Sequence, residues 1–178
     1  CSYRRRATRR HRAARIQHSS ISMQEVQDRR RRKQVPGGSI LHDYVNLYFC
    51  ARNPMLFKRK NYHGNLCVLR INLDVLDIPN VIIADQNASS DYVRFYPSPN
   101  GLSILNKDLI FAEYWTHPEN QILEFQHRSI KCAEVLVPQC VDAKYILGVY
   151  VSCQEALDNF KKTDVNLPAI INKNMFFL

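Results

Sequence analysis

Hydrophobic and polar positions alternate with the two-residue period of a β-strand at several places along the chain. In the stretch Leu41–Cys50, Val45, Leu47 and Phe49 face one way, and the residues between them face the other. Shorter apolar runs predict further strands at Leu66–Ile71, Val81–Ala84, Tyr145–Val151, Pro168–Asn172 and Met175–Leu178.

Helix signals lie between the predicted strands. Ser22-Met23-Gln24-Glu25 has the spacing of a capping box and predicts a helix from Met23 to about Gln34, which Pro36-Gly37-Gly38 stops. Asn53-Pro54 predicts a cap followed by proline at the first helical position. Ser152-Cys153-Gln154-Glu155 repeats the box and predicts a helix to about Lys161. Mostly local strands with segregated helices favour an α+β fold.

Three segments lack a clear period. Asn87–Ser90 is interpreted as a loop tip, and Leu102–Tyr114 as a helical or irregular piece. Trp115–Gln126 contains Pro118 and is interpreted as a long loop. Long loops in compact domains tend to be functional, so this loop is expected to matter.

The long loop leads through the cationic stretch His127–Lys131 into a strand that carries Glu134. Ala133, Val135 and Val137 alternate with Cys132, Glu134 and Leu136. The Glu134 carboxylate therefore points away from the alanine and the valines. A carboxylate on an apolar strand is costly to bury unless it is paired or used. The other interpretation is an edge strand with Glu134 in water, and this stretch alone leaves both open.

Charge divides the chain unequally. Its 178 residues suit one domain with a real core. Residues 1–33 hold 12 of the 25 Lys and Arg against two acidic residues, whereas the remainder holds 13 against 14. Such a basic segment attracts polyanions, usually nucleic acid, although a disordered basic tail is an equal alternative for residues 1–15. The run Arg29–Lys33 could clamp phosphates or be a solvated helix end.

Several common functional classes lack their motifs here. No Gly-x-Gly-x-x-Gly, Walker loop or Gly-x-Ser-x-Gly elbow is present. No cysteine pair has the Cys-x-x-Cys spacing of a zinc site, and no acidic cluster suits a two-metal nuclease. The cysteine usage favours a reducing, cytoplasmic setting, and we expect neither a membrane span nor a signal peptide.

Taken together, the motifs resemble one family. From about Ser19 to Leu178 the chain is similar to the DarT family of DNA ADP-ribosyltransferase toxins, and the order and spacing of the pieces are far more specific than any one of them. The pieces are Ile21–Val35 with Arg29-Arg30, Pro36-Gly37-Gly38, Leu41-His42-Asp43-Tyr44-Val45, Tyr48-Phe49, Ala51–Leu56, Tyr114-Trp115, Arg128–Lys131, Ala133–Val137 and Met175-Phe176-Phe177.

This resemblance implies an ADP-ribosyltransferase fold, with a split β core and NAD+ in its cleft. Glu134 matches the catalytic glutamate, and the segment from about Glu113 to Lys131 matches the loop that presents the target nucleotide. The residues expected to face NAD+ are Arg29 or Arg30, His42, Tyr44, Arg52 and Met55. Those expected to contact DNA are Tyr114, Trp115, Arg128 and Lys131, with a core anchor as an equal alternative for Trp115.

The implied reaction moves ADP-ribose from NAD+ to a base of single-stranded DNA, thymine before guanine. The resemblance also implies a macrodomain antitoxin as partner, with no metal and no membrane. A carboxylate beside the ribose can stabilise the developing oxocarbenium-like centre and accept a proton from the attacking base. Unstacking that base is easiest in a single strand, and aromatic rings supply stacking faces.

The N-terminus departs from the family pattern. The family begins with a short strand carrying a Ser/Thr-His pair that contacts the NAD+ ribose, and nothing before Ser19 supplies it. Its absence would weaken NAD+ binding and could leave the chain inactive. We therefore divide the chain into a basic segment, residues 1–18, and a transferase domain, residues 19–178. A non-catalytic nucleic-acid-binding module and a degenerate transferase remain the rival hypotheses.

Overall fold

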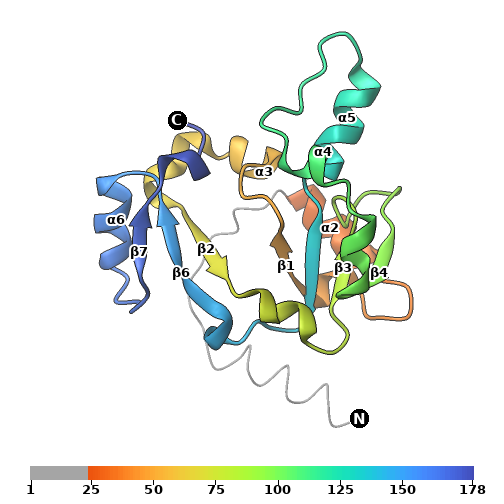
Figure 1. Ribbon diagram of the computed structural model, residues 1–178, viewed down its shortest axis with the longest axis horizontal. Coiled ribbons are helices and arrows are strands. Elements are labelled where there is room, and N and C mark those ends of the chain that lie inside the picture. The colour runs from red at the N-terminus through yellow and green to blue at the C-terminus, as the bar shows by residue number, and fades with distance from the viewer. Residues whose placement is uncertain (1–23) are drawn as a thin grey trace.

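Two β-sheets form the framework of the computed structural model, which describes residues 24–178 (Figure 1). The larger sheet has the order β1-β5-β3-β4 and is antiparallel throughout. In the smaller sheet, β6 pairs antiparallel with β2 and parallel with β7. The strands are β1 (Tyr44–Tyr48), β2 (Cys67–Ile71), β3 (Ile82–Ala84), β4 (Phe95–Pro97), β5 (Glu134–Pro138), β6 (Ile146–Val151) and β7 (Ala169–Ile171).

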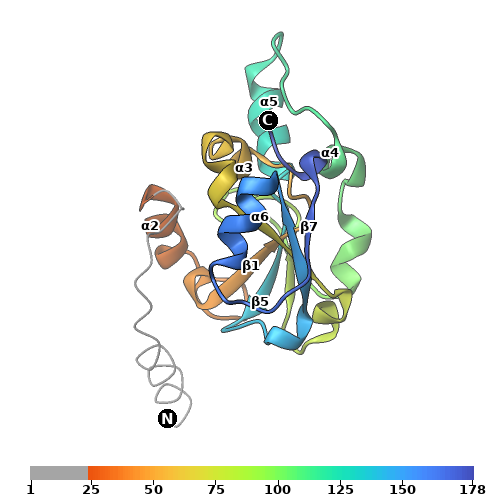
Figure 2. The same cartoon turned by 90° about the vertical axis from the view of Figure 1, so that its left-hand side faces the viewer.

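Helices surround the two sheets. In Figure 1 α2 lies beside the larger sheet, α6 beside the smaller one, and α5 projects beyond both, as Figure 2 also shows. The part of the chain between α2 and β1 carries the predicted Pro36 stop and a short 3-10 turn, Leu41–Asp43. The helices are α2 (Gln24–Arg32), α3 (Pro54–Phe57), α4 (Lys107–Phe111), α5 (Gln121–Ile130) and α6 (Gln154–Lys161).

Strand β5 occupies the interior of the larger sheet, between β1 and β3. Its residues Glu134–Val137 are all buried. Leu136 packs into the cluster that also holds Ala84 and Ala88, whereas Val135 and Val137 pack into a second cluster on the other face. The predicted alternation is therefore confirmed, and the edge-strand alternative for Glu134 is wrong, because partners flank β5 on both sides.

Two capping predictions have different outcomes. Asn53 caps α3 as predicted, since its side-chain oxygen accepts from the backbone N–H of Met55 and of Leu56, each at 3.0 Å. The helix predicted after Ser152 is present as α6, but Cys153 is its N-cap. Ser152 is buried instead and bonds to His63, 2.9 Å from Nδ1, so a tertiary partner replaces the local capping role.

Several element boundaries differ from prediction. The strand predicted for Leu41–Cys50 begins only at Tyr44, and strand β4 was missed because three residues are too short to show a period. The closing strand predicted at Met175–Leu178 is wrong, because a 3-10 turn, Lys173–Met175, occupies its start. The start of the first predicted helix and the whole of residues 1–18 lie outside the described residues.

The largest error concerns the predicted long loop. Residues 121–130 form helix α5, capped by Asn120, whose side-chain oxygen accepts from Leu123 N at 2.9 Å. The stretch taken as a lead-in to the Glu134 strand is therefore the end of a helix. The helix was missed because Pro118, shortly before its start, was taken to mark the whole stretch as a loop; its side chains Ile122 and Phe125 are exposed, at 73% and 65%.

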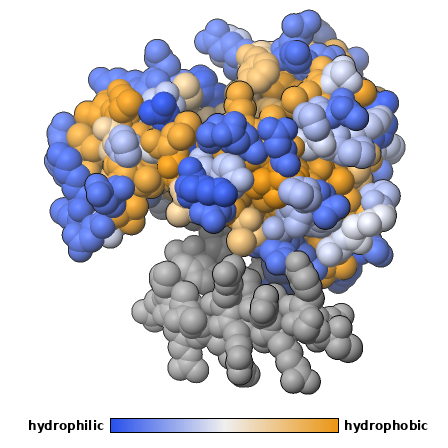
Figure 3. All heavy atoms as spheres, turned by 60° about the horizontal axis from the view of Figure 1, so that its bottom comes forward, coloured by the Kyte–Doolittle hydropathy of each residue, from blue (hydrophilic) through white to orange (hydrophobic). Residues whose placement is uncertain are grey.

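Apolar groups reach the surface on the face shown in Figure 3, most clearly on its left side, where the smaller sheet and α6 lie. Exposed side chains of this sheet include Leu69, Leu147 and Ile170. No helix among residues 24–178 is both long enough and apolar enough to cross a membrane. The same residues contain no group of three or more His, Cys, Asp or Glu side chains placed to hold a metal ion.

Candidate active site

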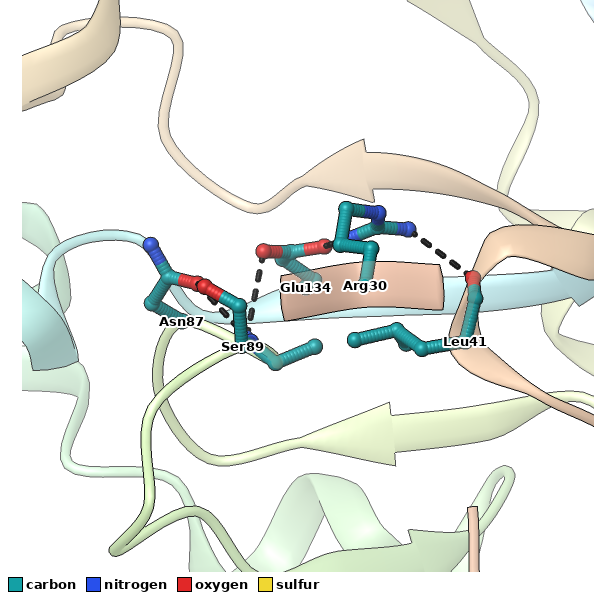
Figure 4. Close-up of polar contacts among 6 residues, drawn as sticks. Arg30, Leu41, Asn87, Ser89 and Glu134 are labelled. Atoms are coloured by element: carbon teal, nitrogen blue, oxygen red, sulfur yellow. Dashed lines mark hydrogen bonds and ion pairs between the residues drawn. The ribbon is translucent and has the colours of Figure 1, made fainter. Parts of the chain in front are cut away.

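The Glu134 carboxylate lies in a closed pocket formed by three segments that are distant in sequence. Only 1% of the residue is exposed. One oxygen, Oε2, accepts from the Arg30 guanidinium of α2 at 3.3 Å, and the other, Oε1, accepts from the backbone N–H of Ala88 at 3.2 Å (Figure 4). Both carboxylate oxygens are therefore held by donors, one charged and one from the main chain.

Arg30 is the arginine of the predicted pair that faces the carboxylate. Its second terminal nitrogen donates to the Leu41 carbonyl at 3.3 Å, and the residue is 6% exposed. Arg29, one position along the helix, points outward and pairs with Glu25 at 3.5 Å with both side chains exposed. Neighbouring positions on a helix point about 100° apart, so only one of the two can turn inward.

The loop Asn87–Ser90 covers the carboxylate. The Asn87 side-chain oxygen accepts from the backbone N–H of Ser89 at 2.9 Å and from its hydroxyl at 2.7 Å, which fixes the turn that presents the Ala88 N–H (Figure 4). Asn87 N donates to the Ser129 carbonyl at the end of α5 at 2.9 Å. The predicted loop at these residues is confirmed, but it folds inward, because Ala88 and Ser89 are buried.

This loop is the functional element that sequence reasoning missed. Its signal was weak but present. The loop directly follows the apolar strand β3, which is the neighbour of β5, and its residues Asn87-Ala88-Ser89 are small enough to pack closely over another side chain. A loop of bulky residues could not bring a backbone N–H to a carboxylate inside the sheet.

Burial dominates the electrostatics of the pocket. It raises the pKa of Glu134, and the charge of Arg30 and the Ala88 N–H only partly oppose that shift. Tyr48 stands directly opposite Glu134 in the β1–β5 register, and burial together with the Glu134 charge raises the pKa of its hydroxyl. The same two causes raise the pKa of the Cys132 thiol to about 12. The pocket thus accommodates one negative charge, beside Arg30.

The other residues predicted to face NAD+ do not bond to Glu134, and Tyr44 pairs with Pro138, at the opposite end of β5 from Glu134. His42 is exposed in the 3-10 turn before β1. Tyr44 is half-buried, and its hydroxyl accepts from Ser39 N at 3.2 Å. A Cβ on Gly38 would meet that hydroxyl, so a larger residue there would displace the Tyr44 side chain. Met55 is half-buried in the first turn of α3. Their contact with NAD+ stays a prediction.

Arg52 turns toward the C-terminal segment. Its guanidinium donates to the carbonyls of Asn174 and Phe176 and stacks 4.3 Å from the centre of the Phe177 ring. Arg52 also lines a cleft of about 660 Å³. The sequence placed Arg52 in the NAD+ set, and the structure places it at the border between the region around Met55 and this cleft.

The four residues predicted to contact DNA fall into two groups. Tyr114 is 70% exposed, and Arg128 is exposed in a smaller cleft of about 420 Å³, 4.0 Å from Glu124. Trp115, in contrast, is 8% exposed, and Lys131 is 1% exposed.

The two buried members of this set have partners within the chain. Trp115 packs edge-on against Phe57 and Phe177, with ring centroids 5.7 and 5.8 Å away, as its core-anchor alternative describes. Lys131 Nζ donates to the carbonyls of Ile110 and Ala112, at the end of α4. In this conformation both residues hold the segment 113–131 in place, whereas Tyr114 and Arg128 are exposed.

The geometry supports a specific kind of chemistry. A carboxylate with a raised pKa can accept a proton near neutral pH and can bind a hydroxyl group. In a pocket of low polarity it also stabilises a developing positive charge more strongly than it would in water. The guanidinium of Arg30 favours its ionised form and orients it. Such a site suits the cleavage of a bond whose transition state is cationic.

Comparisons with known proteins agree with this fold. A family model described as "ssDNA thymidine ADP-ribosyltransferase, DarT" matches residues 5–177. A DNA ADP-ribosyl transferase–DNA ADP-ribosyl glycohydrolase fusion protein of Thermosipho africanus is 33% identical over 180 residues, covering 93% of this chain and 44% of that protein. The chain spans about half the length of the curated relatives it matches, between 44% and 59%.

Solved structures extend the likeness to three dimensions. One is Thermus sp. 2.9 DarT in complex with ADP-ribosylated ssDNA, with a TM-score of 0.74 and 25% identity over 91% of this chain and 83% of that chain. Another is Thermosipho africanus DarTG in complex with ADP-ribose, with a TM-score of 0.74 and 26% identity over 92% of this chain and 43% of that chain. The chain has the α+β ADP-ribosyltransferase fold and belongs to the DarT family.

Proposed function

We propose that this protein transfers ADP-ribose from NAD+ to a base of single-stranded DNA, with thymine preferred and guanine as the alternative. The observation that carries the proposal is the Glu134 carboxylate, buried in the larger sheet and held by Arg30 and the Ala88 N–H. Support comes from the family model, whose description names thymidine in ssDNA, and from the similar Thermus protein solved with ADP-ribosylated ssDNA.

Glu134 has two tasks in the proposed reaction. The bond between nicotinamide and ribose breaks, its electron pair leaves with nicotinamide, and positive charge develops on the ribose. Glu134 stabilises that charge by binding the ribose 2′-hydroxyl. A ring nitrogen of the base then bonds to the ribose carbon, and Glu134 takes the proton that this nitrogen gives up. The raised pKa of Glu134 suits this proton transfer.

Access to the site requires a local opening. Glu134 is 1% exposed, so a ribose reaches it only if α2 or the loop Asn87–Ser90 moves aside. Each carboxylate oxygen has a second lone pair, so a ribose hydroxyl can be added while Arg30 stays in place. We assign Arg30, His42, Tyr44, Met55 and the inner side of Arg52 to the NAD+ site within this proposal.

The DNA contacts in the proposal come from the segment before β5. Tyr114 offers an exposed ring for stacking, and Arg128 offers a cation for the backbone or the base. Trp115 and Lys131 support the segment from inside. In this proposal the two exposed residues contact the DNA, and the two buried residues keep their segment close to Glu134.

A macrodomain antitoxin is the proposed protein partner. The similar Thermosipho africanus protein joins a transferase to a DNA ADP-ribosyl glycohydrolase in one chain, and a hydrolase of that kind would reverse the modification. We also place the activity in the cytoplasm, where DNA is available and where the five described cysteines would stay free thiols, as they are in the structure. The division between residues 1–18 and 19–178 remains a prediction.

Mass spectrometry of short oligonucleotides tests the proposal. The protein is incubated with NAD+ and with single strands that differ only in carrying thymine or guanine at one position, with the matching duplexes as controls. We expect a mass increase of one ADP-ribose on the thymine strand and little on the duplexes. Binding without any mass increase at either base would favour a non-catalytic nucleic-acid-binding module. Absence of NAD+ binding by calorimetry would indicate a degenerate transferase.

A further inference from the structure

One cleft among residues 24–178 is lined by several positively charged side chains. It has a volume of about 660 Å³. Arg52, Lys60 and Lys173 line it, together with His63, and no Asp or Glu does. None of the three cations forms a salt bridge with a described residue. Uncompensated cations that gather in one concave surface attract a polyanion.

Aromatic rings lie among these cations. Lys60 Nζ stands 4.7 Å above the Phe57 ring, and the Arg52 guanidinium stacks 4.3 Å from the Phe177 ring. The two rings contact each other edge-on, with centroids 5.2 Å apart, and Phe57 is 43% exposed. Cations beside aromatic faces are the combination that binds single-stranded nucleic acid, because the cations track phosphates while bases stack on the rings.

The cleft opens at the end of the sheets where Glu134 lies. Strand β1 ends opposite Glu134, and Arg52 follows it four residues after Tyr48. The other lining residues precede β2 or follow β7, and Arg52 joins the two regions by donating to Asn174 and Phe176 carbonyls. Figure 1 shows the C-terminal segment beside α3 on the side of the molecule where β5 begins.

Trp115 connects the cleft with the target-presenting segment. Its ring packs on Phe57 and Phe177, which line the cleft, while its neighbour Tyr114 is 70% exposed. A single DNA strand with one base stacked on Tyr114 could continue onto the aromatic and cationic surface of the cleft.

We propose that this cleft binds the phosphodiester backbone of the DNA strand next to the modified base, through Lys60 and Lys173 with stacking on Phe57. This inference rests on the proposed function for the identity of the strand. Arg52 lines this cleft and is also assigned to the NAD+ site in the proposed function, so the test does not change it. The site adds an anchor outside the loop and helix that present the target base.

Charge reversal tests the cleft in the absence of NAD+. The double variant Lys60→Glu, Lys173→Glu is compared with the control Lys144→Glu, Lys162→Glu, which changes net charge equally at the opposite end of the smaller sheet. Fluorescence anisotropy measures the Kd of a labelled thymine-containing single strand across salt concentrations. We expect a Kd increase on the order of tenfold in the cleft variant and a salt slope smaller by about 1.4, because two contacts are lost. The control should keep most of the wild-type slope.

Two results would contradict DNA binding in this cleft. One is an oligonucleotide Kd in the cleft variant equal to that of the control. The other is a loss of NAD+ affinity by calorimetry with DNA affinity unchanged, since the cleft would then hold the pyrophosphate. Because binding is read without NAD+, a wild-type protein that binds through the cleft but transfers nothing would refute the proposed activity and leave this site standing.

A second measurement uses the wild-type protein and does not depend on the folding of any variant. Single strands carrying 5-iodouracil at successive positions are cross-linked by light, and the modified peptides are identified by mass spectrometry. We expect cross-links to the peptides holding Phe57 and Phe177 from positions next to the target base. Cross-links confined to the segment 113–131 would contradict the proposal.

Discussion

The Arg30 guanidinium lies 3.3 Å from the Glu134 carboxylate, and 104 residues separate the two in sequence. Both are nearly excluded from solvent, with side-chain exposures of 7% and 2%. A pair of this kind costs desolvation energy on both sides, so it is weak evidence for stability by itself. Its value lies in fixing the Glu134 carboxyl group at one position inside the sheet.

Removing Arg30 should damage both stability and activity. Arg30→Ala leaves Glu134 buried without its cation, which costs about 3–5 kcal/mol unless the carboxylate takes up a proton. Arg29→Ala is the matched control on the same helix, and we expect a change below about 1 kcal/mol because its pair with Glu25 is exposed. Urea denaturation and transfer assays check both variants. Equal effects of the two substitutions would show that the inward pairing is unimportant.

The pH dependence of stability should report on Glu134. Burial raises its folded-state pKa above the ordinary value of 4.5, so its protonated form stabilises the fold below that pH. That contribution is lost as pH rises through the raised pKa. The stability of Glu134→Gln relative to wild type should therefore increase from about pH 4.5 upward, by at most about 1.4 kcal/mol per pH unit, and then level off. A relative stability that is flat above pH 4.5 and changes only below it would mean that Arg30 outweighs burial.

Asn87 should act as a positioning residue. Asn87→Ala removes the acceptor that fixes the turn, so the Ala88 N–H is no longer held in position to donate to Glu134. We expect kcat for transfer to fall about tenfold or more, with little change in the KM for NAD+. Asn72→Ala, which removes a similar turn acceptor at Asp74 N, is the control for stability alone. If both variants keep wild-type kcat, the loop has no part in aligning the carboxylate.

Arg128 and Lys131 should differ in DNA binding although both were predicted to contact DNA. Arg128 is exposed, so Arg128→Ala should remove one phosphate contact and reduce the salt slope of oligonucleotide binding by about 1. Lys131→Met should leave that slope unchanged and instead destabilise the fold by roughly 1–3 kcal/mol, because the Ile110 and Ala112 carbonyls lose their donor. A lower salt slope in the Lys131 variant would show that this side chain reaches DNA in solution.

Sequence patterns predicted best where a local signal is strong. The alternation in β1, the Asn53 cap and the position of Glu134 on its strand follow from residues that are neighbours in sequence. The family resemblance added the fold and the catalytic candidate, because a rare order of motifs is specific even when each motif is not. Helix α5 was missed because Pro118 lies shortly before its start and was taken as a sign that the whole stretch is a loop.

Tertiary pairing could not be predicted from these patterns. Nothing local distinguishes Arg30 from Arg29, and only the fold shows which of them turns toward β5. The contact between Ala88 N and Glu134 involves a backbone group, which leaves no mark on the residue type. Lys131 looked like a DNA contact because cations usually face solvent, whereas here three oxygen and sulfur partners hold it inside.

The most direct test of the central claim measures transfer of labelled ADP-ribose from NAD+ to a thymine-containing single strand by Glu134→Ala and Glu134→Gln. Glu155→Gln, an exposed position on α6, serves as the control with the same chemical change. The account predicts that transfer by both Glu134 variants falls at least about 100-fold while their strand affinity persists and the control stays active. Transfer near the wild-type rate by folded Glu134→Ala would contradict it.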